Sequence, residues 1–131
     1  MKRINSLTHG IVDYVIGFLL LVAPFLVGFS DNEPARNSAW VVGAAIILYS
    51  LATDYELGVF KLIPYRIHLG LDCVIGVFLA TSPWLLDFSD RIAWPHVAFG
   101  LLEVGIALIT RPATSAGDAH HLPRTAAPAG R

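Results

Sequence analysis

One segment of this chain occurs twice, at a constant offset of 59 residues and without a gap. Residues 9–31 read HGIVDYVIGFLLLVAPFLVGFSD, and residues 68–90 read HLGLDCVIGVFLATSPWLLDFSD. Internal repetition constrains the architecture before any single residue does, because each copy must form the same unit. Each copy is mostly apolar and long enough to cross a bilayer. The sequence therefore predicts a tandem duplication of a membrane hairpin.

The composition agrees with a membrane protein. Hydrophobic residues make up 55% of the chain, charged residues 15%, and the mean hydropathy is +0.62. A soluble domain carries roughly 25% charged residues because it needs a solvated surface. The net charge of −1 gives no reason to expect a nucleic-acid partner. The one cysteine, Cys73, lies in an apolar segment and cannot form an internal disulfide.

Four membrane spans are expected, at residues 7–29, 34–53, 64–88 and 95–110. A helix needs about 20 apolar residues to cross a hydrocarbon core of ~30 Å, and the fourth span is short by this measure. The predicted fold is an all-α, four-helix transmembrane bundle built from two tandem parallel helical-hairpin repeats. The expected parts are an N-terminus (1–6), a first hairpin (7–53), an interfacial link (54–63), a second hairpin (64–111) and a disordered tail (112–131).

The basic residues predict the orientation of the bundle. Seven of the nine lie in the N-terminus, the central link and the C-terminal region, and two lie in the other connections, namely Arg36 and Arg91. The positive-inside rule then places both termini and the link in the cytoplasm. The two hairpins share one orientation, so their pseudo-two-fold axis is expected along the membrane normal. The link is apolar, and we expect it to lie in the interface with Lys61 among the headgroups.

The tripeptide Ser82-Pro83-Trp84 stands inside the second copy, and Ala23-Pro24-Phe25 takes its place in the first. With the His-x-x-x-Asp pattern that opens each copy, this segment resembles the SPW repeat family of small bacterial integral membrane proteins. The resemblance covers most of residues 7–111. It implies a repeat of two transmembrane helices and a location in the bacterial cytoplasmic (inner) membrane. It implies no particular biochemical activity, and the first copy lacks the serine and the tryptophan of the signature.

Two His–Asp pairs are the first candidates for chemistry. Asp13 and Asp72 lie inside the predicted spans, and His9 and His68 precede them by four residues, on the same helix face. If the repeat axis brings the first and third spans together, the four side chains converge. Two imidazoles and two carboxylates are a reasonable ligand set for zinc or another divalent metal, and they can also pass protons. The interpretation we favour is structural, with the pairs satisfied internally or bonded across to neighbouring helices.

Glu103 is expected midway along the fourth span, where Ile46 aligns with it in the second span. No lysine or arginine is expected at membrane depth beside it, so we expect a protonated carboxyl that bonds to a neighbouring helix. The alternative is a proton or cation site. His96, near the far end of the same span, is expected to be an interfacial hydrogen-bonding group. Gly17 and Gly76 are equivalent in the repeat and are expected at the contact between the hairpins.

Pro24 and Pro83 each free a backbone carbonyl one turn earlier and bend their helices. Ser82 is placed to bond such a carbonyl. After each proline the sequence reads Phe-Ser-Asp, and we expect these serines or aspartates, or Asn32 or Glu33, to cap the helix that follows.

No phosphate-binding glycine loop, zinc-protease motif, Cys-x-x-Cys pair or activated nucleophile occurs in the sequence. We therefore expect neither an enzyme nor a resident cofactor. The function we predict is a structural or accessory role, in which the protein packs with itself or with a larger membrane partner in the bilayer. The alternatives are an oligomeric transporter or channel, or a protein that handles metal ions or protons through the His–Asp pairs and Glu103.

Overall fold

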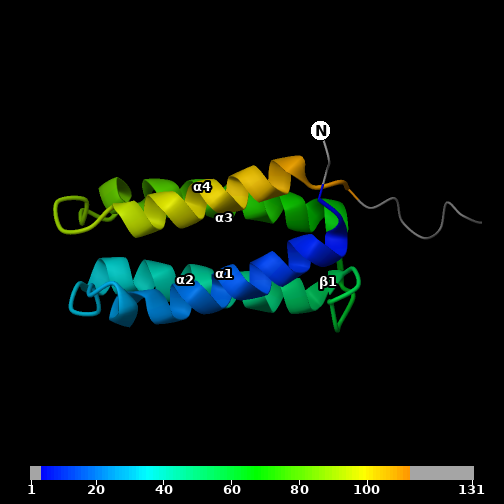
Figure 1. The fold of residues 1–131 in the computed structure, drawn as a ribbon, viewed down its shortest axis with the longest axis horizontal. Coiled ribbons are helices and arrows are strands. Elements are labelled where there is room, and N and C mark those ends of the chain that lie inside the picture. The colour runs from blue at the N-terminus through cyan, green and yellow to red at the C-terminus, as the bar shows by residue number, and fades with distance from the viewer. Residues whose placement is uncertain (1–3, 113–131) are drawn as a thin grey trace, which may run out of the picture.

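The computed structural model of the protein describes residues 4–112 and consists of four helices aligned along one axis (Figure 1). The helices are α1 (Ser6–Leu26), α2 (Glu33–Ala52), α3 (Tyr65–Leu85) and α4 (Trp94–Ile109). This arrangement confirms the all-α four-helix bundle that the repeat predicts. The first and third helices end three residues before the predicted limits of their spans, at the turn that follows each proline. The predicted tail from residue 113 onward lies outside the described residues.

Three of the helices, α1, α2 and α3, are long and apolar enough to cross a membrane. The fourth, α4, has 16 residues and is shorter than a usual span. Large apolar side chains such as Phe18, Leu48 and Leu101 point outward and are exposed on the isolated bundle. Their outward orientation is expected for helices that face lipid tails.

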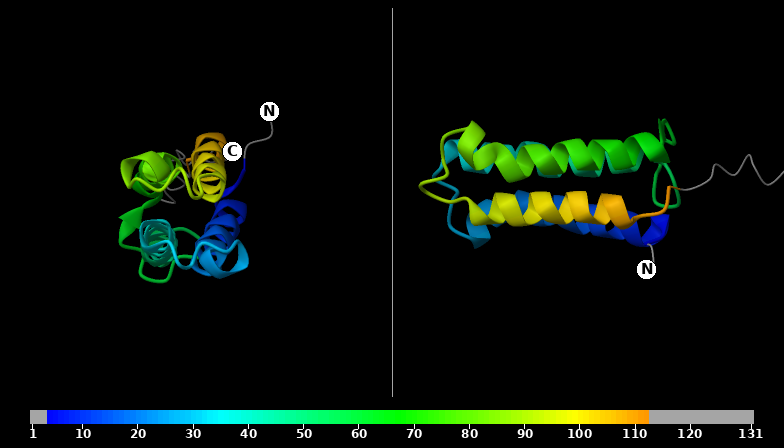
Figure 2. Two further views of the ribbon diagram at one scale, coloured as in Figure 1. Left: turned by 90° about the vertical axis from the view of Figure 1, so that its left-hand side faces the viewer. Right: turned by 90° about the horizontal axis from the view of Figure 1, so that it is seen from above.

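The helices occupy the corners of a square when viewed along the bundle axis (Figure 2). Helix α1 packs against α2 and α4, and α3 packs against the same two helices. Helices α1 and α3, which carry the two copies of the repeated segment, are therefore diagonal to each other. Side chains from α1 and α3 that point inward meet at the centre of the bundle, where a two-fold axis between the hairpins must pass.

Glycine pairs bring the helices of each hairpin into close contact. A Cβ added at Gly43 would lie 2.7 Å from the carbonyl oxygen of Gly17, and a Cβ added at Gly100 would lie 2.4 Å from that of Gly76. The expectation that Gly17 and Gly76 mediate the contact between hairpins is therefore wrong, because both lie inside their own hairpins. The hairpins meet instead along α2 with α3 and α1 with α4.

The two hairpins are joined at one end of the bundle, which we call the link end, by residues 53–64. Strands β1 (Thr53–Asp54) and β2 (Ile63–Pro64) form a short parallel pair there. A bridge between Ile4 and Thr110 repeats this pairing between the start of the first hairpin and the end of the second, with Arg111 N donating to Ile4 O at 3.0 Å. The ends of α2 and α4 are thus held in the same way, close to the start of α3 and of α1.

The opposite end, the turn end, holds the two connections within the hairpins. Gly28 and Asp87 occupy equivalent positions of the repeat, and both have a positive φ (80° and 58°). Ser82 Oγ donates a hydrogen bond to Leu79 O at 2.7 Å, which is the carbonyl that Pro83 frees, as predicted. Asn32 caps α2 through Ala35 N, whereas α4 has no side-chain cap. The prediction of Asn32 as a cap is therefore confirmed, whereas the predicted capping by the Phe-Ser-Asp segments is wrong.

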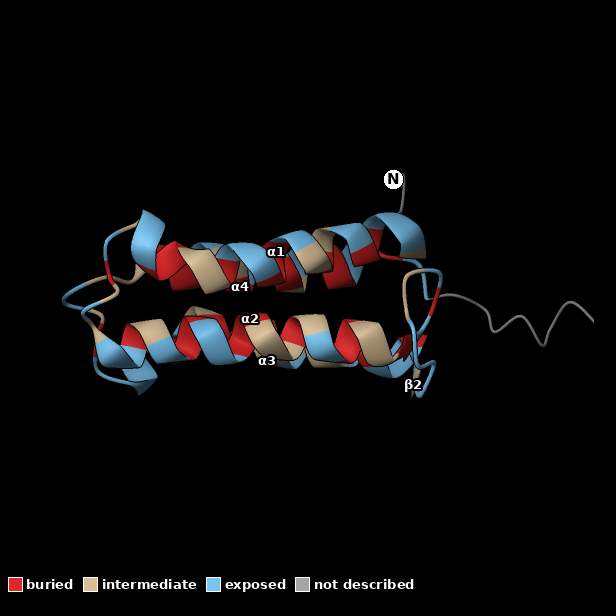
Figure 3. Ribbon diagram, turned by 90° about the horizontal axis from the view of Figure 1, so that it is seen from below, coloured by how far each residue is buried: buried red, intermediate tan, exposed pale blue. Residues whose placement is uncertain are grey.

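Buried residues line the inner faces of all four helices, and exposed residues cover the outside (Figure 3). The middle of the core is apolar and includes Ile16, Leu20, Ile46 and Leu79. Polar side chains interrupt this core mainly at the link end.

Candidate functional site

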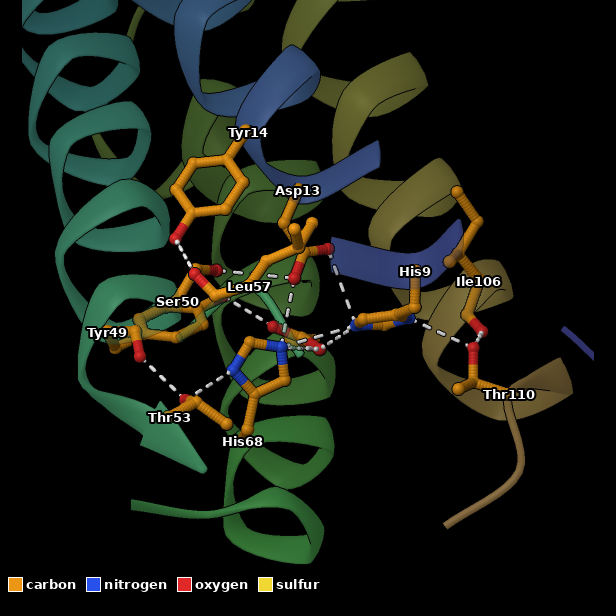
Figure 4. Close-up of polar contacts among 11 residues, drawn as sticks. His9, Asp13, Tyr14, Tyr49, Ser50, Thr53, Leu57, His68, Ile106 and Thr110 are labelled. Carbon is orange, nitrogen blue, oxygen red and sulfur yellow. Dashed lines mark hydrogen bonds and ion pairs between the residues drawn. The ribbon is translucent and has the colours of Figure 1, made fainter. Parts of the chain in front are cut away.

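His9, Asp13 and His68 come together in the centre of the bundle at the link end (Figure 4), and Asp72 lies with them. We call these four residues the His–Asp cluster. All four side chains are fully buried, and one donor atom from each lies within 4.8 Å of the others. Each histidine precedes its aspartate by one helical turn, so both point to the same side of their helix. The diagonal placement of α1 and α3 brings the two pairs face to face.

The closest contacts in the His–Asp cluster cross between the repeats. His9 Nε2 lies 2.9 Å from Asp72 Oδ2, and His68 Nε2 lies 2.9 Å from Asp13 Oδ2. The contacts within one helix are longer, at 3.4 Å in both copies. The cluster therefore joins one hairpin to the other, and its geometry follows the two-fold symmetry of the repeat.

Two threonines contact the Nδ1 atoms of the histidines, on the side of each ring that faces away from the cluster. Thr53 Oγ1 donates to Tyr49 O at 2.6 Å and lies 2.9 Å from His68 Nδ1. Likewise, Thr110 Oγ1 donates to Ile106 O at 2.6 Å and lies 2.9 Å from His9 Nδ1. Because each hydroxyl hydrogen is used on a backbone carbonyl, the threonine oxygen accepts a hydrogen bond from Nδ1–H. Both rings therefore direct Nε2 into the cluster.

The two Nε2 atoms lie 3.3 Å apart and face carboxylate oxygens. In a neutral imidazole with a proton on Nδ1, Nε2 carries a lone pair, which is repelled by a carboxylate oxygen at hydrogen-bond distance. The arrangement thus requires a proton or a cation between the Nε2 atoms and the carboxylate oxygens. Either one proton lies in each of the two 2.9 Å contacts, or one cation is shared by the four donors.

The surroundings of the two aspartates break the symmetry. The Tyr49 hydroxyl donates to Asp72 Oδ1, and Ser50 Oγ donates to Asp13 Oδ2 at 3.3 Å. The equivalent positions in the second hairpin hold Ile106 and Ala107. Asp13 Oδ1 has no hydrogen-bond partner among the described residues.

Sequence reasoning did not assign Tyr49, Ser50, Thr53 or Thr110 to the site. The two threonines could have been recognised in the sequence, because they occupy equivalent positions at the ends of their helices. The tyrosine and the serine could not, because each occurs in one copy only.

Aromatic rings close the link end of the His–Asp cluster. Tyr65 stacks on His68 with ring centroids 5.6 Å apart, and Tyr55 stacks on Tyr65 at 5.7 Å. Gly10 leaves room for the Tyr55 ring, since a Cβ there would lie 2.2 Å from Tyr55 Cε2. Burial raises the pKa of the Tyr55 hydroxyl above its ordinary value, so this group stays protonated at neutral pH. The cluster is therefore shielded from water at the end where it lies nearest to the surface.

Glu103 is fully buried on α4 and is not a member of the His–Asp cluster. A Cβ added at Gly76 would lie 3.0 Å from Glu103 Cβ, which places Glu103 beside α3, one turn beyond Asp72 towards the turn end. Neither carboxyl oxygen has a hydrogen-bond partner among residues 4–112. The expected bond from Glu103 to a neighbouring helix is therefore not found among these residues.

His96 lies near the turn end but is buried, not interfacial as expected. Its Nε2 lies 3.0 Å from Ala35 O and 3.1 Å from Ser38 Oγ, so it bonds across to α2. The rings of Phe29 and Phe88 pack on it, with centroids 5.5 and 4.8 Å away. The sequence showed a polar residue near a helix end, but the His96 ring points into the bundle, where it bonds to α2 and packs on Phe29 and Phe88.

The signature tripeptides lie at the turn end, away from the His–Asp cluster. Pro24, Ser82 and Pro83 are buried, whereas Phe25 and Trp84 face outward and are about two-thirds exposed (65% and 63%). The serine and proline shape the helix end, and the aromatic residues face the surroundings. The tripeptides therefore do not contribute to the candidate site.

The family model described as SPW repeat domain matches residues 7–110, which covers both hairpins. No curated protein and no solved structure matches the chain.

Proposed function

The chain belongs to the SPW repeat family of membrane proteins, and we propose that it holds one divalent metal ion between its two hairpins, in the His–Asp cluster. The ion joins the hairpins inside the membrane, and the protein has a structural or accessory role there. The observation that carries the proposal is the arrangement of the two histidines. Thr53 and Thr110 direct both Nε2 atoms towards the carboxylates of the other repeat.

The distances within the cluster fit a tetrahedral metal ion. Zinc lies about 2.0–2.2 Å from histidine nitrogen and carboxylate oxygen, so two donors in a tetrahedron are about 3.3–3.6 Å apart. The Nε2 atoms of His9 and His68 are 3.3 Å apart, and the nitrogen–oxygen distances range from 2.9 to 3.4 Å. Metal binding would lengthen the two 2.9 Å contacts to this spacing.

The charges in the His–Asp cluster also balance. Two carboxylates neutralise one divalent cation when both imidazoles are neutral, and they neutralise two imidazolium rings when the ion is absent. A metal ion can thus replace two protons without leaving net charge in the membrane interior, where an isolated charge is costly. Metal binding at this site releases up to two protons.

The donor set narrows the choice of metal and of role. Imidazole with carboxylate suits zinc, manganese or ferrous iron, whereas calcium and magnesium prefer oxygen ligands alone. Four protein donors fill a tetrahedral zinc site, which is typical of structural zinc and leaves no position for a substrate. This donor count supports a structural role over an enzymatic one.

A second candidate is a bundle held by protons alone. The cluster then consists of two imidazolium–carboxylate pairs, each of which crosses between the repeats at 2.9 Å. The contacts from Tyr49, Thr53 and Thr110 are compatible with this state as well. In both forms the cluster fixes the register of the hairpins. The two forms differ only in whether a metal ion is bound.

We further propose that the link end faces the cytoplasm of a bacterial cell, on the strength of the basic residues near it. Lys61 contributes to this end, with its Nζ bonded to Tyr55 O at 2.7 Å, beside exposed Val59, Phe60 and Leu62. Such a mixture of apolar tips and a lysine suits the membrane interface. The outward apolar faces of the helices offer contact to lipid, to a second copy or to a larger membrane partner.

Elemental analysis of the protein purified in detergent, without a histidine tag, tests the metal proposal. The parent in this experiment carries His120→Ala and His121→Ala, because these adjacent histidines lie outside the described residues and can bind metal adventitiously. The parent should contain about one metal ion per chain, and His9→Ala/His68→Ala should contain none. Glu103→Gln is the matched control, since it alters a buried polar side chain near the cluster without removing a donor.

Thermal unfolding with and without a chelator completes the test. Metal at about 100 times its Kd should add about 2.7 kcal/mol to the stability of the parent and nothing to that of the double variant. A parent without metal that unfolds at the same temperature before and after metal is added would eliminate the metal-bound form and leave the proton-held bundle.

A further inference from the structure

The buried polar groups that lack partners among the described residues run from the link end of the bundle to the turn end. Six buried side-chain atoms have no hydrogen-bond partner among the described residues, and they belong to Tyr55, Tyr65, Asp13, Glu103 and His96. The tyrosines lie at the link end, Asp13 in the cluster, Glu103 farther along α4 and His96 near the turn end. The set therefore extends along the bundle, and Glu103 and His96 form the part beyond the His–Asp cluster.

These two residues lie on one face of α4. Residues 96, 103 and 110 are spaced by seven, so His96, Glu103 and Thr110 lie about two turns apart on the same side. All three are buried. The equivalent positions on α2 are Ala39, Ile46 and Thr53, so the first two polar groups occur in one hairpin only. The two-fold symmetry of the core is broken where these polar groups occur.

His96 can take up and release a proton. Ala35 O can only accept a hydrogen bond, so His96 Nε2 carries the hydrogen that it donates at 3.0 Å. In the neutral ring Nδ1 then has a free lone pair, and it is buried without a partner among the described residues. A proton that arrives at Nδ1 gives an imidazolium, and loss of the Nε2 proton next to Ser38 restores the neutral ring.

Glu103 is the second proton-carrying group in such a transfer. An ionised carboxylate in the bundle interior without a cation beside it is costly, so Glu103 carries a proton. The charged or titratable groups that act on it from the neighbouring helices are Asp13 on α1, Tyr49 on α2 and Asp72 on α3. None of these three supplies a positive charge that would hold Glu103 ionised, and the positive charge of the His–Asp cluster is balanced by its own two carboxylates.

We propose that Glu103 is a proton-binding site in the membrane interior that exchanges its proton with the turn end of the bundle through His96. In the outward direction, the carboxyl proton of Glu103 passes through water to His96 Nδ1. The Nε2 proton of His96 then leaves to water at the turn end, and the reverse sequence reloads Glu103. The ligand of this site is a proton carried by water. The proposal does not depend on metal in the His–Asp cluster.

An apolar layer separates the two groups and limits the exchange. Leu20 and Leu79 are equivalent, fully buried residues in this part of the core. Leu20 packs at Gly43, the counterpart of Gly100, and Gly100 lies between His96 and Glu103 on α4. Water must cross this layer for a proton to pass, so exchange at Glu103 should be slow but measurable.

Infrared spectroscopy of the whole protein in lipid tests this directly. The carboxylic-acid C=O band that disappears in Glu103→Gln identifies the protonated group. Its rate of hydrogen–deuterium exchange is then followed after H₂O is replaced by D₂O. His96→Gln keeps a donor for Ala35 O but lacks a titratable nitrogen, and it should slow this exchange about tenfold or more. Tyr55→Phe at the link end is the control and should leave the rate unchanged.

Leu79→Ala supplies a second test in case His96→Gln fails to fold. It opens the apolar layer to water and should accelerate the exchange of the Glu103 band. Three results overturn the proposal: no C=O band assigned to Glu103, the same exchange rate in the parent and in both His96→Gln and Leu79→Ala, or a slower rate in Tyr55→Phe. Metal content plays no part in this readout, so its outcome is distinct from that of the metal test.

Discussion

Replacing Thr53 by valine should weaken metal binding without disturbing any of the four donors. Valine has nearly the shape of threonine but lacks the hydroxyl that lies 2.9 Å from His68 Nδ1. The Nδ1–H group is then left buried without an acceptor, at a cost of about 1–3 kcal/mol. The bond that directs Nε2 into the cluster is lost as well, and removing such a partner behind a metal-bound histidine usually lowers metal affinity about ten- to a hundredfold.

The repeat supplies a matched variant and the fold supplies a control. Thr110→Val removes the equivalent contact to His9 and should weaken binding to a comparable degree. Thr81 also bonds the carbonyl one turn before it, Val77 O at 2.8 Å, but it is exposed and away from the cluster. Thr81→Val should therefore leave the affinity unchanged.

Competition titration of zinc against a chromophoric chelator, with the proteins in detergent, measures these affinities. The absorption spectrum of the cobalt-substituted protein reports whether the site stays tetrahedral. If Thr53→Val binds zinc as tightly as Thr81→Val does, the threonines do not orient the histidines and the reasoning is refuted.

Three further changes test other parts of the structure. Gly100→Ala should destabilise the protein by about 1–3 kcal/mol in thermal unfolding, because its Cβ would lie 2.5 Å from the backbone nitrogen of Ala80. Gly105→Ala is the control and should be neutral, because its Cβ points into open space. Equal unfolding midpoints would contradict the close packing of α3 on α4. Ser82→Ala leaves the carbonyl freed by Pro83 without its donor and should cost about 1 kcal/mol in the same assay; no change would mean that the hydroxyl bond to Leu79 O adds nothing. Tyr49→Phe leaves Asp72 Oδ1 without its donor and should lower the thermal midpoint of the metal-free protein, as measured by circular dichroism. An unchanged midpoint would show that this contact does not stabilise the bundle.

The repeat allowed the main architecture to be predicted, because it is a property of the sequence itself. Two equal apolar segments in one orientation imply an axis between them, and the helices pack around such an axis as expected. The convergence of the two His–Asp pairs followed from the same symmetry, given that α1 and α3 meet. The position and depth of both pairs along their helices could also be predicted, since four-residue spacing fixes a shared face.

The contacts between helices could not be predicted in the same way. Gly17 and Gly76 fit any close helix contact, and sequence periodicity does not say which neighbour a helix face meets. The structure places them inside the hairpins. The burial of His96 depends on its ring pointing into the bundle towards Ala35 of α2, which no local pattern records. Tyr49 and Ser50 were missed because each has no counterpart of the same residue type in the second hairpin, so the comparison of the two copies does not mark them.

X-ray absorption at the metal edge of the protein loaded with one equivalent of zinc tests the central claim most directly. The account predicts four nitrogen or oxygen donors at about 2.0–2.2 Å, with the outer-shell signal of two imidazoles and no sulfur. The outer-shell signal should disappear in His9→Ala/His68→Ala. A sulfur donor, a shell of oxygen atoms alone, or the same spectrum from the double variant would contradict a metal ion held between the hairpins by the His–Asp cluster.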